Sequence, residues 1–143
     1  MIVNGNIRTL HPIVCEEVLI IGKEALGNAF RHSHGRSIEA ELNYAPNEFQ
    51  MRIRDDGAGI DPAILNHGRR EGHWGLPGMR ERAEKIGAHL DIWSGTATGT
   101  EIELRLAAHV AYIQMPGRHL RERLRGLWPQ KTRRQGKIGA LRD

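Results

Sequence analysis

The sequence lacks most of the features that would anchor or cross-link a protein outside the cytosol. Its 143 residues include one cysteine, Cys15, which excludes an internal disulfide, and one thiol among scattered histidines gives no zinc-ligand spacing. The longest aliphatic block, 18–21, is far shorter than the roughly 20 residues of a membrane span. The N-terminus has no basic segment followed by an apolar one, the pattern of a secretory signal. We therefore expect a cytoplasmic protein in which Cys15 is a small buried hydrophobe rather than a catalytic thiol.

Positive charge is scarce over most of the chain and concentrated at its end. The formal net charge of +4 combines 12 Lys/Arg against 15 Asp/Glu in residues 1–117 with 9 against 2 in residues 118–143. The folded part is therefore mildly acidic, and we expect it to bind no nucleic acid. We predict one domain over 1–109, its first strand truncated, and a basic tail over 110–143, flexible or partly helical.

The basic tail allows two interpretations. Its apolar residues fall on one face of a helix, interleaved with arginines, as a segment that contacts a membrane or an acidic partner would show. We favour the other interpretation, a frayed and solvated tail. The apolar residues are Leu120, Leu124, Leu127 and Trp128.

Hydrophobic periodicity predicts an α+β fold. Apolar residues at three- and four-residue steps favour a helix over 12–32, and strict alternation favours a strand hairpin over 37–44 and 48–55. A polar loop over 60–74 leads to a second helix that ends at Gly87, and strands follow over 89–94 and 100–107. This order indicates a two-layer sandwich with a mixed, mostly antiparallel sheet and helices on one face.

A carboxylate stands where an apolar residue is expected. Asp55 shares the inner face of its strand with Phe49, Met51 and Ile53, because side chains two residues apart point to the same side. A carboxylate there is unfavourable unless a group hydrogen-bonds it. Gly57 and Gly59 follow, and glycines let the backbone pass close to a ligand. The pattern indicates a pocket floor with one acceptor pointing inward.

Three further features point to the same side. Asn28 follows Ile21 and Ala25 on the apolar stripe of the first helix, with Glu24 one turn before it, and Thr100 has the inward parity of its strand. Each has an ordinary structural explanation: a core amide, a solvated carboxylate and a strand-edge hydroxyl. The start of the second helix, 75–79, carries two glycines, and backbone N–H groups at a helix start bind anions. Their joint occurrence favours a functional site.

These residues form motifs that resemble a known family, the ATP-binding catalytic domains of sensor histidine kinases, with the Bergerat fold that gyrase-type and mismatch-repair ATPases share. The match covers about 2–107. The sequence of residues 73–79 is similar to that of the subgroup with short ATP lids, which includes nitrate- and membrane-fluidity-type sensors. Four motifs carry the resemblance, in the expected order: Glu24–His32 (the N box), Asp55–Ile60 and Gly75–Arg82 (two glycine boxes), and Gly99-Thr100.

The resemblance implies a base side of an ATP site. Asp55 would accept a hydrogen bond from the exocyclic amine of adenine, a bond worth about 1.5–3 kcal/mol to a charged partner. Gly57 and Gly59 would admit the base, and Thr100 would reach it directly or through water. The apolar residues that complete the implied ATP site are Ile60, Leu76 and Met79.

The resemblance also implies a phosphate side. Asn28 would ligate Mg²⁺, which prefers oxygen ligands, and Glu24 would assist the ion or polarise the attacking group. Arg31 and His32 would face the phosphates. Gly75 and Gly78 would free the helix start to cradle them. The loop 60–74 would be the lid, and its Arg69 or Arg70 is a candidate contact for the γ-phosphate.

By resemblance, the chain is expected to supply the γ-phosphate for histidine autophosphorylation, with a response regulator downstream. The phosphoacceptor histidine of such kinases lies on a separate helical hairpin, which we expect elsewhere in a longer, membrane-anchored protein. His11 lies directly before Pro12 and is interpreted as structural. Alone, the chain should bind ATP and Mg²⁺ but not phosphorylate itself. Three alternatives remain open: a serine kinase of the anti-sigma-factor type, a nucleotide-binding module that does not catalyse, and nucleic-acid binding through residues 118–143.

Overall fold

The predicted α+β sandwich is confirmed by a computed structural model that describes residues 1–60, 75–95 and 98–113. The loop 61–74, with Arg69 and Arg70, and the tail residues 114–143 lie outside the described part. The elements in chain order are β1 (Ile2–Gly5), α1 (Pro12–His32), β2 (Ile38–Tyr44), β3 (Glu48–Asp55), α3 (Gly75–Lys85), β4 (His89–Gly95), β5 (Gly99–Ala107) and α4 (Ala108–Ala111).

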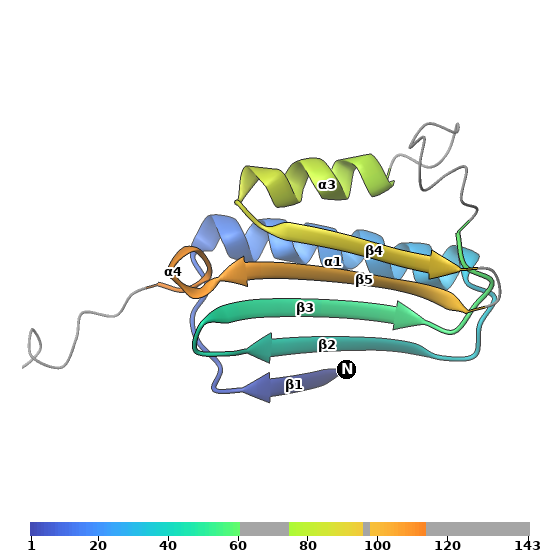
Figure 1. The fold of residues 1–143 in the computed structure, drawn as a ribbon, viewed down its shortest axis with the longest axis horizontal. Helices are drawn as coiled ribbons and strands as arrows, with labels where there is room; N and C mark the ends of the chain where they lie inside the picture. Colours follow the sequence, from blue (N-terminus) through green and yellow to red (C-terminus); the bar gives the residue numbers. More distant parts are fainter. Residues whose placement is uncertain (61–74, 96–97, 114–143) are drawn as a thin grey trace, which may run out of the picture. The chain divides into compact units, whose positions relative to one another are not determined.

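The strands form one mixed sheet in the order β1-β2-β3-β5-β4. β1 pairs with β2 in parallel, and the other three pairings are antiparallel. β1 is four residues long. Figure 1 shows α1 running along the back of the sheet, and α3 contacts both α1 and β4. The helices therefore cover one face of the sheet.

The core lies between this face and the helices. Phe49, Met51 and Ile53 on β3 alternate inward, as do Ile102, Leu104 and Leu106 on β5, and the helices supply Val18, Ile21 and Met79. Gly22 of α1 packs closely against β3, and a Cβ there would lie 3.1 Å from the Met51 sulfur. The strand parity predicted from the sequence is confirmed, and with it the inward side of β3.

The opposite face of the sheet is polar. Charged residues of neighbouring strands pair across it, including Arg52 with Glu41 and Arg105 with Asp91, the latter at 2.8 Å between Nη2 and Oδ2. Such half-exposed pairs contribute little to stability individually. Because this face carries charged side chains that can remain in solvent, the sheet needs helices to cover its other, apolar face only.

α1 and α3 are joined by a buried carboxylate. Glu17 is 2% exposed, and it forms ion pairs with Lys85 and with Arg82, whose Nη1 lies 2.9 Å from Oε2. The hydrogen bonds from Lys85 and Arg82 lower the pKa of Glu17 below its ordinary value of 4.5.

The compact unit extends to Ile113, a little beyond the domain end expected from the sequence. α4 carries Tyr112 back to the sheet, where the ring is 2% exposed and the hydroxyl lies 2.9 Å from the Glu48 carbonyl oxygen. Burial raises the pKa of the Tyr112 hydroxyl. The Arg8 guanidinium carbon lies 3.7 Å from the centroid of the Tyr112 ring, so the two side chains form a cation–π interaction.

The expectation that Cys15 is buried is wrong. Cys15 is exposed, because its neighbour Val14 lies on the buried stripe of α1 and adjacent helical residues point about 100° apart. The polar side of α1 therefore includes a thiol. Within the described ranges, no helix is long and apolar enough to cross a membrane.

We predict that Glu17→Gln lowers the melting temperature by a few degrees at pH 7, because the buried ion pairs lose their charge. A carboxyl group with a lowered pKa in the folded state stabilises the fold above its unfolded pKa, and this contribution is lost as pH falls through the folded pKa. The difference between variant and wild type should therefore shrink below about pH 4. Circular-dichroism melts between pH 7 and pH 3 measure it.

The matched control is Glu16→Gln, which removes a carboxylate from the exposed side of the same helical turn. We expect this variant to melt within about a degree of wild type at every pH, as surface substitutions usually do. Equal melting temperatures for Glu17→Gln and wild type at pH 7 would contradict the stabilising role of the buried ion pairs.

Candidate functional site

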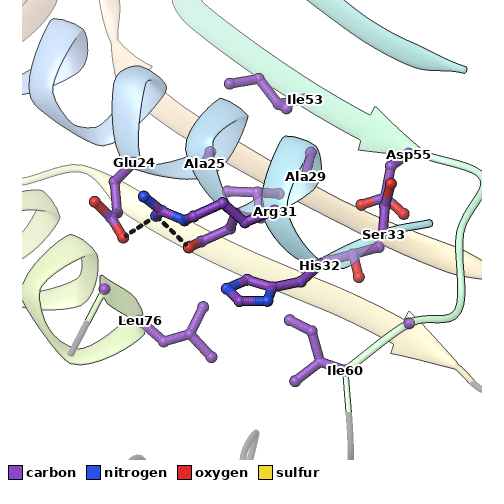
Figure 2. A pocket seen from close by; sticks show the side chains of 15 residues that line it. Glu24, Ala25, Ala29, Arg31, His32, Ser33, Ile53, Asp55, Ile60 and Leu76 are labelled. Atoms are coloured by element: carbon purple, nitrogen blue, oxygen red, sulfur yellow. Dashed lines mark hydrogen bonds and ion pairs between the residues drawn. The ribbon is translucent and has the colours of Figure 1, made fainter. Parts of the chain in front are cut away.

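A cavity of about 480 Å³ opens between α1, the start of α3 and the ends of the central strands. Figure 2 shows Glu24 and Asp55 at opposite ends of it, with Ile60, His32 and Leu76 between them. Ten of the residues proposed from the sequence line the cavity together: Glu24, Asn28, Arg31, His32, Asp55, Gly59, Ile60, Gly75, Leu76 and Thr100.

The floor of the cavity is a polar row across three strands. Asp55 on β3 is the register partner of Thr100 on β5, and Thr100 is the register partner of Ser94 on β4. Directly opposed residues of antiparallel strands have Cβ atoms about 4.5–5.5 Å apart. Ser94 Oγ lies 2.9 Å from Thr100 Oγ1. Strand register thus brings a carboxylate and two hydroxyls into one line.

Asp55 is 6% exposed and has one acceptor oxygen already engaged. The Gly57 N–H donates to its Oδ1 at 2.9 Å, the kind of backbone bond that makes a buried carboxylate tolerable. Among the described residues, no other hydrogen bond to this side chain is present. Oδ2 is therefore available to accept a hydrogen bond from a ligand on the cavity floor.

The other end of the cavity is formed by the last turns of α1. Glu24, Asn28 and Arg31 are spaced at four and three residues, which places them on one face of the helix. Arg31 Nη2 donates to Asn28 Oδ1 at 3.2 Å and lies 3.6 Å from Glu24 Oε1. Figure 2 shows Arg31 reaching back toward Glu24. The Arg31 side chain is 59% exposed, so these bonds exchange readily with a ligand.

Glu24 also marks the contact between α1 and the start of α3. A Cβ on Gly75 would lie 2.2 Å from Glu24 Oε1, so the missing side chain leaves room for this carboxylate. Leu76, the next residue, is buried and lines the cavity. Gly75 thereby brings the first turn of α3 close to Glu24, and the N–H groups at a helix start favour a bound anion.

Three residues proposed from the sequence do not line the cavity. Met79 is a core residue, 1% exposed, because it lies one turn after Leu76 on the sheet-facing side of α3. Gly57 packs against α1's end, where a Cβ would lie 2.0 Å from the Ser33 carbonyl oxygen. Gly78 faces open space. Gly57 therefore shapes the chain behind the floor, and a role for Gly78 in the site stays a prediction.

Sequence reasoning missed Ser94 and the apolar walls. Ser94 has the inward parity of Leu90 and Ile92 on its strand, the same signal that identified Thr100, and could have been found in that way. Ser33, 8% exposed, lines the cavity, whereas Ser94 lies behind the lining residues. The Ser33 carbonyl oxygen accepts the Ala58 N–H at 2.7 Å. The apolar walls are Ala25, Ala29, Ile53 and Ile102.

The donor set suits a small hard cation more than a zinc-type site. Within the described part of the chain there is no group of three or more His, Cys, Asp or Glu side chains that could hold a metal. Asn28 Oδ1 and the Glu24 carboxylate provide one or two oxygen ligands, which is the usual protein contribution to Mg²⁺ when phosphates supply the rest. The cavity can thus hold a flat apolar ligand at one end and a metal-bound anion at the other.

We predict opposite effects for the two glycines that do not line the cavity. Gly57→Ala forces a methyl group onto the Ser33 backbone and should destabilise the fold by about 1–3 kcal/mol. Gly78→Ala meets no atom and should stabilise α3 by up to about 1 kcal/mol. Denaturant unfolding of both variants measures this contrast, and equal stabilities would refute the close packing at Gly57.

Comparison with known proteins adds a family to this geometry. The family model described as "Histidine kinase-, DNA gyrase B-, and HSP90-like ATPase" matches residues 16–110. The chain is 37% identical over 107 residues to the sensor protein NarQ homolog of Haemophilus influenzae, covering 73% of this chain and 18% of that protein. It is 38% identical over 87 residues to the sensor protein VraS of Staphylococcus aureus, covering 59% of this chain and 23% of that protein.

Solved structures show the same fold. The histidine kinase domain of the Erythrobacter litoralis EL346 blue-light activated histidine kinase superposes with a TM-score of 0.60 at 20% identity, over 73% of this chain and 52% of that one. A second structure of that kinase gives 0.59 at 19% identity, over 73% of this chain and 33% of that one. The chain spans about a fifth of the length of the sensor proteins it matches.

Proposed function

The chain belongs to the histidine kinase-, DNA gyrase B- and HSP90-like ATPase family, and from this membership we propose that its cavity binds ATP with Mg²⁺. We further propose that it supplies the γ-phosphate for histidine autophosphorylation in a two-component sensor kinase. The phosphoacceptor histidine would belong to another domain of the full-length kinase, and a response regulator would receive the phosphoryl group. Such an activity requires a compartment that holds ATP, the cytoplasm.

The observation that carries the proposal is the buried carboxylate on the cavity floor. Among the residues that the structure describes, Asp55 Oδ2 has no hydrogen-bond partner while Oδ1 is fixed by the Gly57 N–H, so the site offers an oriented acceptor to an amino group. Ile53 and Ile102 beside it are buried, as the wall of a slot for a flat ring would be. A hydrogen bond to a charged acceptor in such a slot contributes about 1.5–3 kcal/mol.

The phosphate end is supported by the groups on α1 and α3. Asn28 and Glu24 would hold the Mg²⁺ that neutralises the phosphates, with Arg31 and His32 facing the same end of the cavity. Arg31 would exchange its bonds to Asn28 and Glu24 for a phosphate oxygen, which frees Asn28 Oδ1 for the metal. Glu24 then lies beside Gly75, where it would polarise the attacking histidine nitrogen.

We predict that Asp55→Asn weakens the binding of a non-hydrolysable ATP analogue by at least about 100-fold, because an amide NH₂ would face the amino group of the base. Isothermal titration calorimetry with Mg²⁺ measures it. The matched control is Asp56→Asn. Asp56 does not line the cavity, and its Oδ1 accepts hydrogen bonds from the Arg36 and Ser37 N–H groups at 2.8 and 2.9 Å. Asp56→Asn should bind within about threefold of wild type, and unchanged affinity in Asp55→Asn would rule out this pocket.

We predict that Glu24→Gln slows phosphoryl transfer to a phosphoacceptor helical-hairpin domain supplied in trans by about 100-fold, the usual contribution of a positioned acid–base group. Binding of the ATP analogue should weaken far less, by about tenfold at most, because Asn28 and the phosphate oxygens would still hold the Mg²⁺. Radiolabelled product that is acid-labile and alkali-stable identifies phosphohistidine. An acid-stable product would indicate phosphoserine instead and contradict the proposed reaction.

A further inference from the structure

The hydroxyl of Ser94 joins three segments around the cavity. It accepts the Ile60 N–H at 2.7 Å, and it lies 3.1 Å from the Gly99 carbonyl oxygen and 2.9 Å from Thr100 Oγ1. Ile60 and Thr100 line the cavity, whereas Ser94 lies behind them. Any effect of Ser94 on a ligand must therefore pass through Ile60 and Thr100.

One assignment of protons satisfies all three of these hydrogen bonds at once. A serine hydroxyl has one proton and two lone pairs. The Ile60 N–H occupies one lone pair, and the Gly99 carbonyl can only accept, so it takes the Ser94 proton. The contact with Thr100 then requires Thr100 to donate to Ser94. The Thr100 proton is thereby held away from the cavity, and the lone pairs of its oxygen face the ligand.

This arrangement makes the cavity floor an acceptor-only surface. Thr100 is the register partner of Asp55, whose ionised carboxylate can only accept. A ligand group that rests on both must bring N–H or O–H donors, because a carbonyl oxygen there would face lone pairs and leave buried polar atoms unpaired. A 6-amino group of a purine can present two N–H donors to this surface, whereas a 6-oxopurine places its carbonyl oxygen against it and offers N1–H as the one donor of that edge.

We propose that Ser94 is a positioning residue that orients the Thr100 hydroxyl and so makes the site select a 6-aminopurine over a 6-oxopurine nucleotide. The inference rests on the proposed nucleotide-binding function and adds to it the origin of base specificity. Ser94 also fixes the Ile60 backbone through its N–H, which holds the apolar wall in place beside the base. Both effects act on the base end of the cavity, away from Asn28 and Glu24.

The test compares ADP with inosine diphosphate, which differ at position 6 of the purine ring, by calorimetry on the full chain with Mg²⁺. Wild type should prefer ADP. Ser94→Ala should weaken ADP binding about tenfold, because it removes the hydrogen bonds that hold the Ile60 backbone and the Thr100 hydroxyl in place. It should also narrow the ADP preference about fivefold, because the released Thr100 proton can turn to the 6-oxo oxygen. A role in folding alone would weaken both nucleotides equally and leave their ratio unchanged.

Two further variants isolate the mechanism. Thr98→Ala removes a hydroxyl from the same turn, one that donates to the Gly95 carbonyl at 3.0 Å and does not line the cavity of the candidate site; it should leave the ratio at the wild-type value. In a Thr100→Val background, Ser94→Ala should no longer change the ratio, because the hydroxyl it orients is gone. Melting curves check that each variant is folded, and Thr100→Val alone should narrow the preference, so the acceptor floor is tested even if Ser94→Ala does not fold.

The possible outcomes distinguish a failure of the proposed role of Ser94 from a failure of the proposed nucleotide binding. An unchanged ratio in Ser94→Ala, or a narrowing that persists with Thr100→Val, would overturn the role of Ser94 while leaving nucleotide binding intact. Equal affinity of wild type for ADP and inosine diphosphate would do the same. Failure of wild type to bind either nucleotide would overturn the proposed function and the inference together.

Discussion

The register of β3 between β2 and β5 is the constraint on which the site depends. Asp55 pairs with Ile38 on one side and Thr100 on the other, and its strand buries Phe49, Met51 and Ile53 on the same face. Because the side-chain period of a strand is two, a slip of one residue would place Arg54 against the helices and Asp55 in solvent. The apolar residues thus determine where the carboxylate lies, and the energy that holds it inward comes from the core rather than from the site.

A second set of contacts determines where α3, whose first residues line the cavity, lies relative to α1. Glu17 ties α1 to Arg82 and Lys85 near the end of α3, and Gly75 at the other end of α3 meets Glu24. The two helices are therefore held at both ends, polar contact at one and close packing at the other. A buried carboxylate loses hydration that its two ion pairs must replace, so the contact is favourable only when the helices hold Glu17 against Arg82 and Lys85.

Much of this arrangement could be predicted from the sequence, because it follows from periodicity. The helix over 12–32 and the strand over 48–55 match α1 and β3, and strand parity alone brought Asp55 and Thr100 to one face. Helical periodicity also predicts the exposure of Cys15, because this residue follows the buried Val14 and so lies off the buried stripe of α1. The residue type suggested burial, and the helix geometry determined exposure.

Other features depend on contacts that no local pattern encodes. α4 spans four residues, too few for a periodic signal, and it forms because Tyr112 can reach the carbonyls of the β2–β3 turn. The same holds for Gly57, which the sequence presents as part of a ligand-binding motif. Its need for glycine arises from the Ser33 carbonyl 2.0 Å from a would-be Cβ, a contact between segments far apart in the chain.

The polar row shows how such long-range contacts give the site its chemical character. Each of its members satisfies another before any ligand arrives: Gly57 binds Asp55, Thr100 binds Ser94, and Ser94 holds Ile60. The hydrogen bonds that are formed lower the free-energy cost of burying these groups, and Asp55 Oδ2 is left as an acceptor with no partner among the described residues. Because every donor in the row is already used, the atoms left facing the cavity are acceptors. Selectivity then arises from the requirement that the row be paired in the folded protein, so the same hydrogen bonds that make the floor stable also determine which ligand groups it can receive.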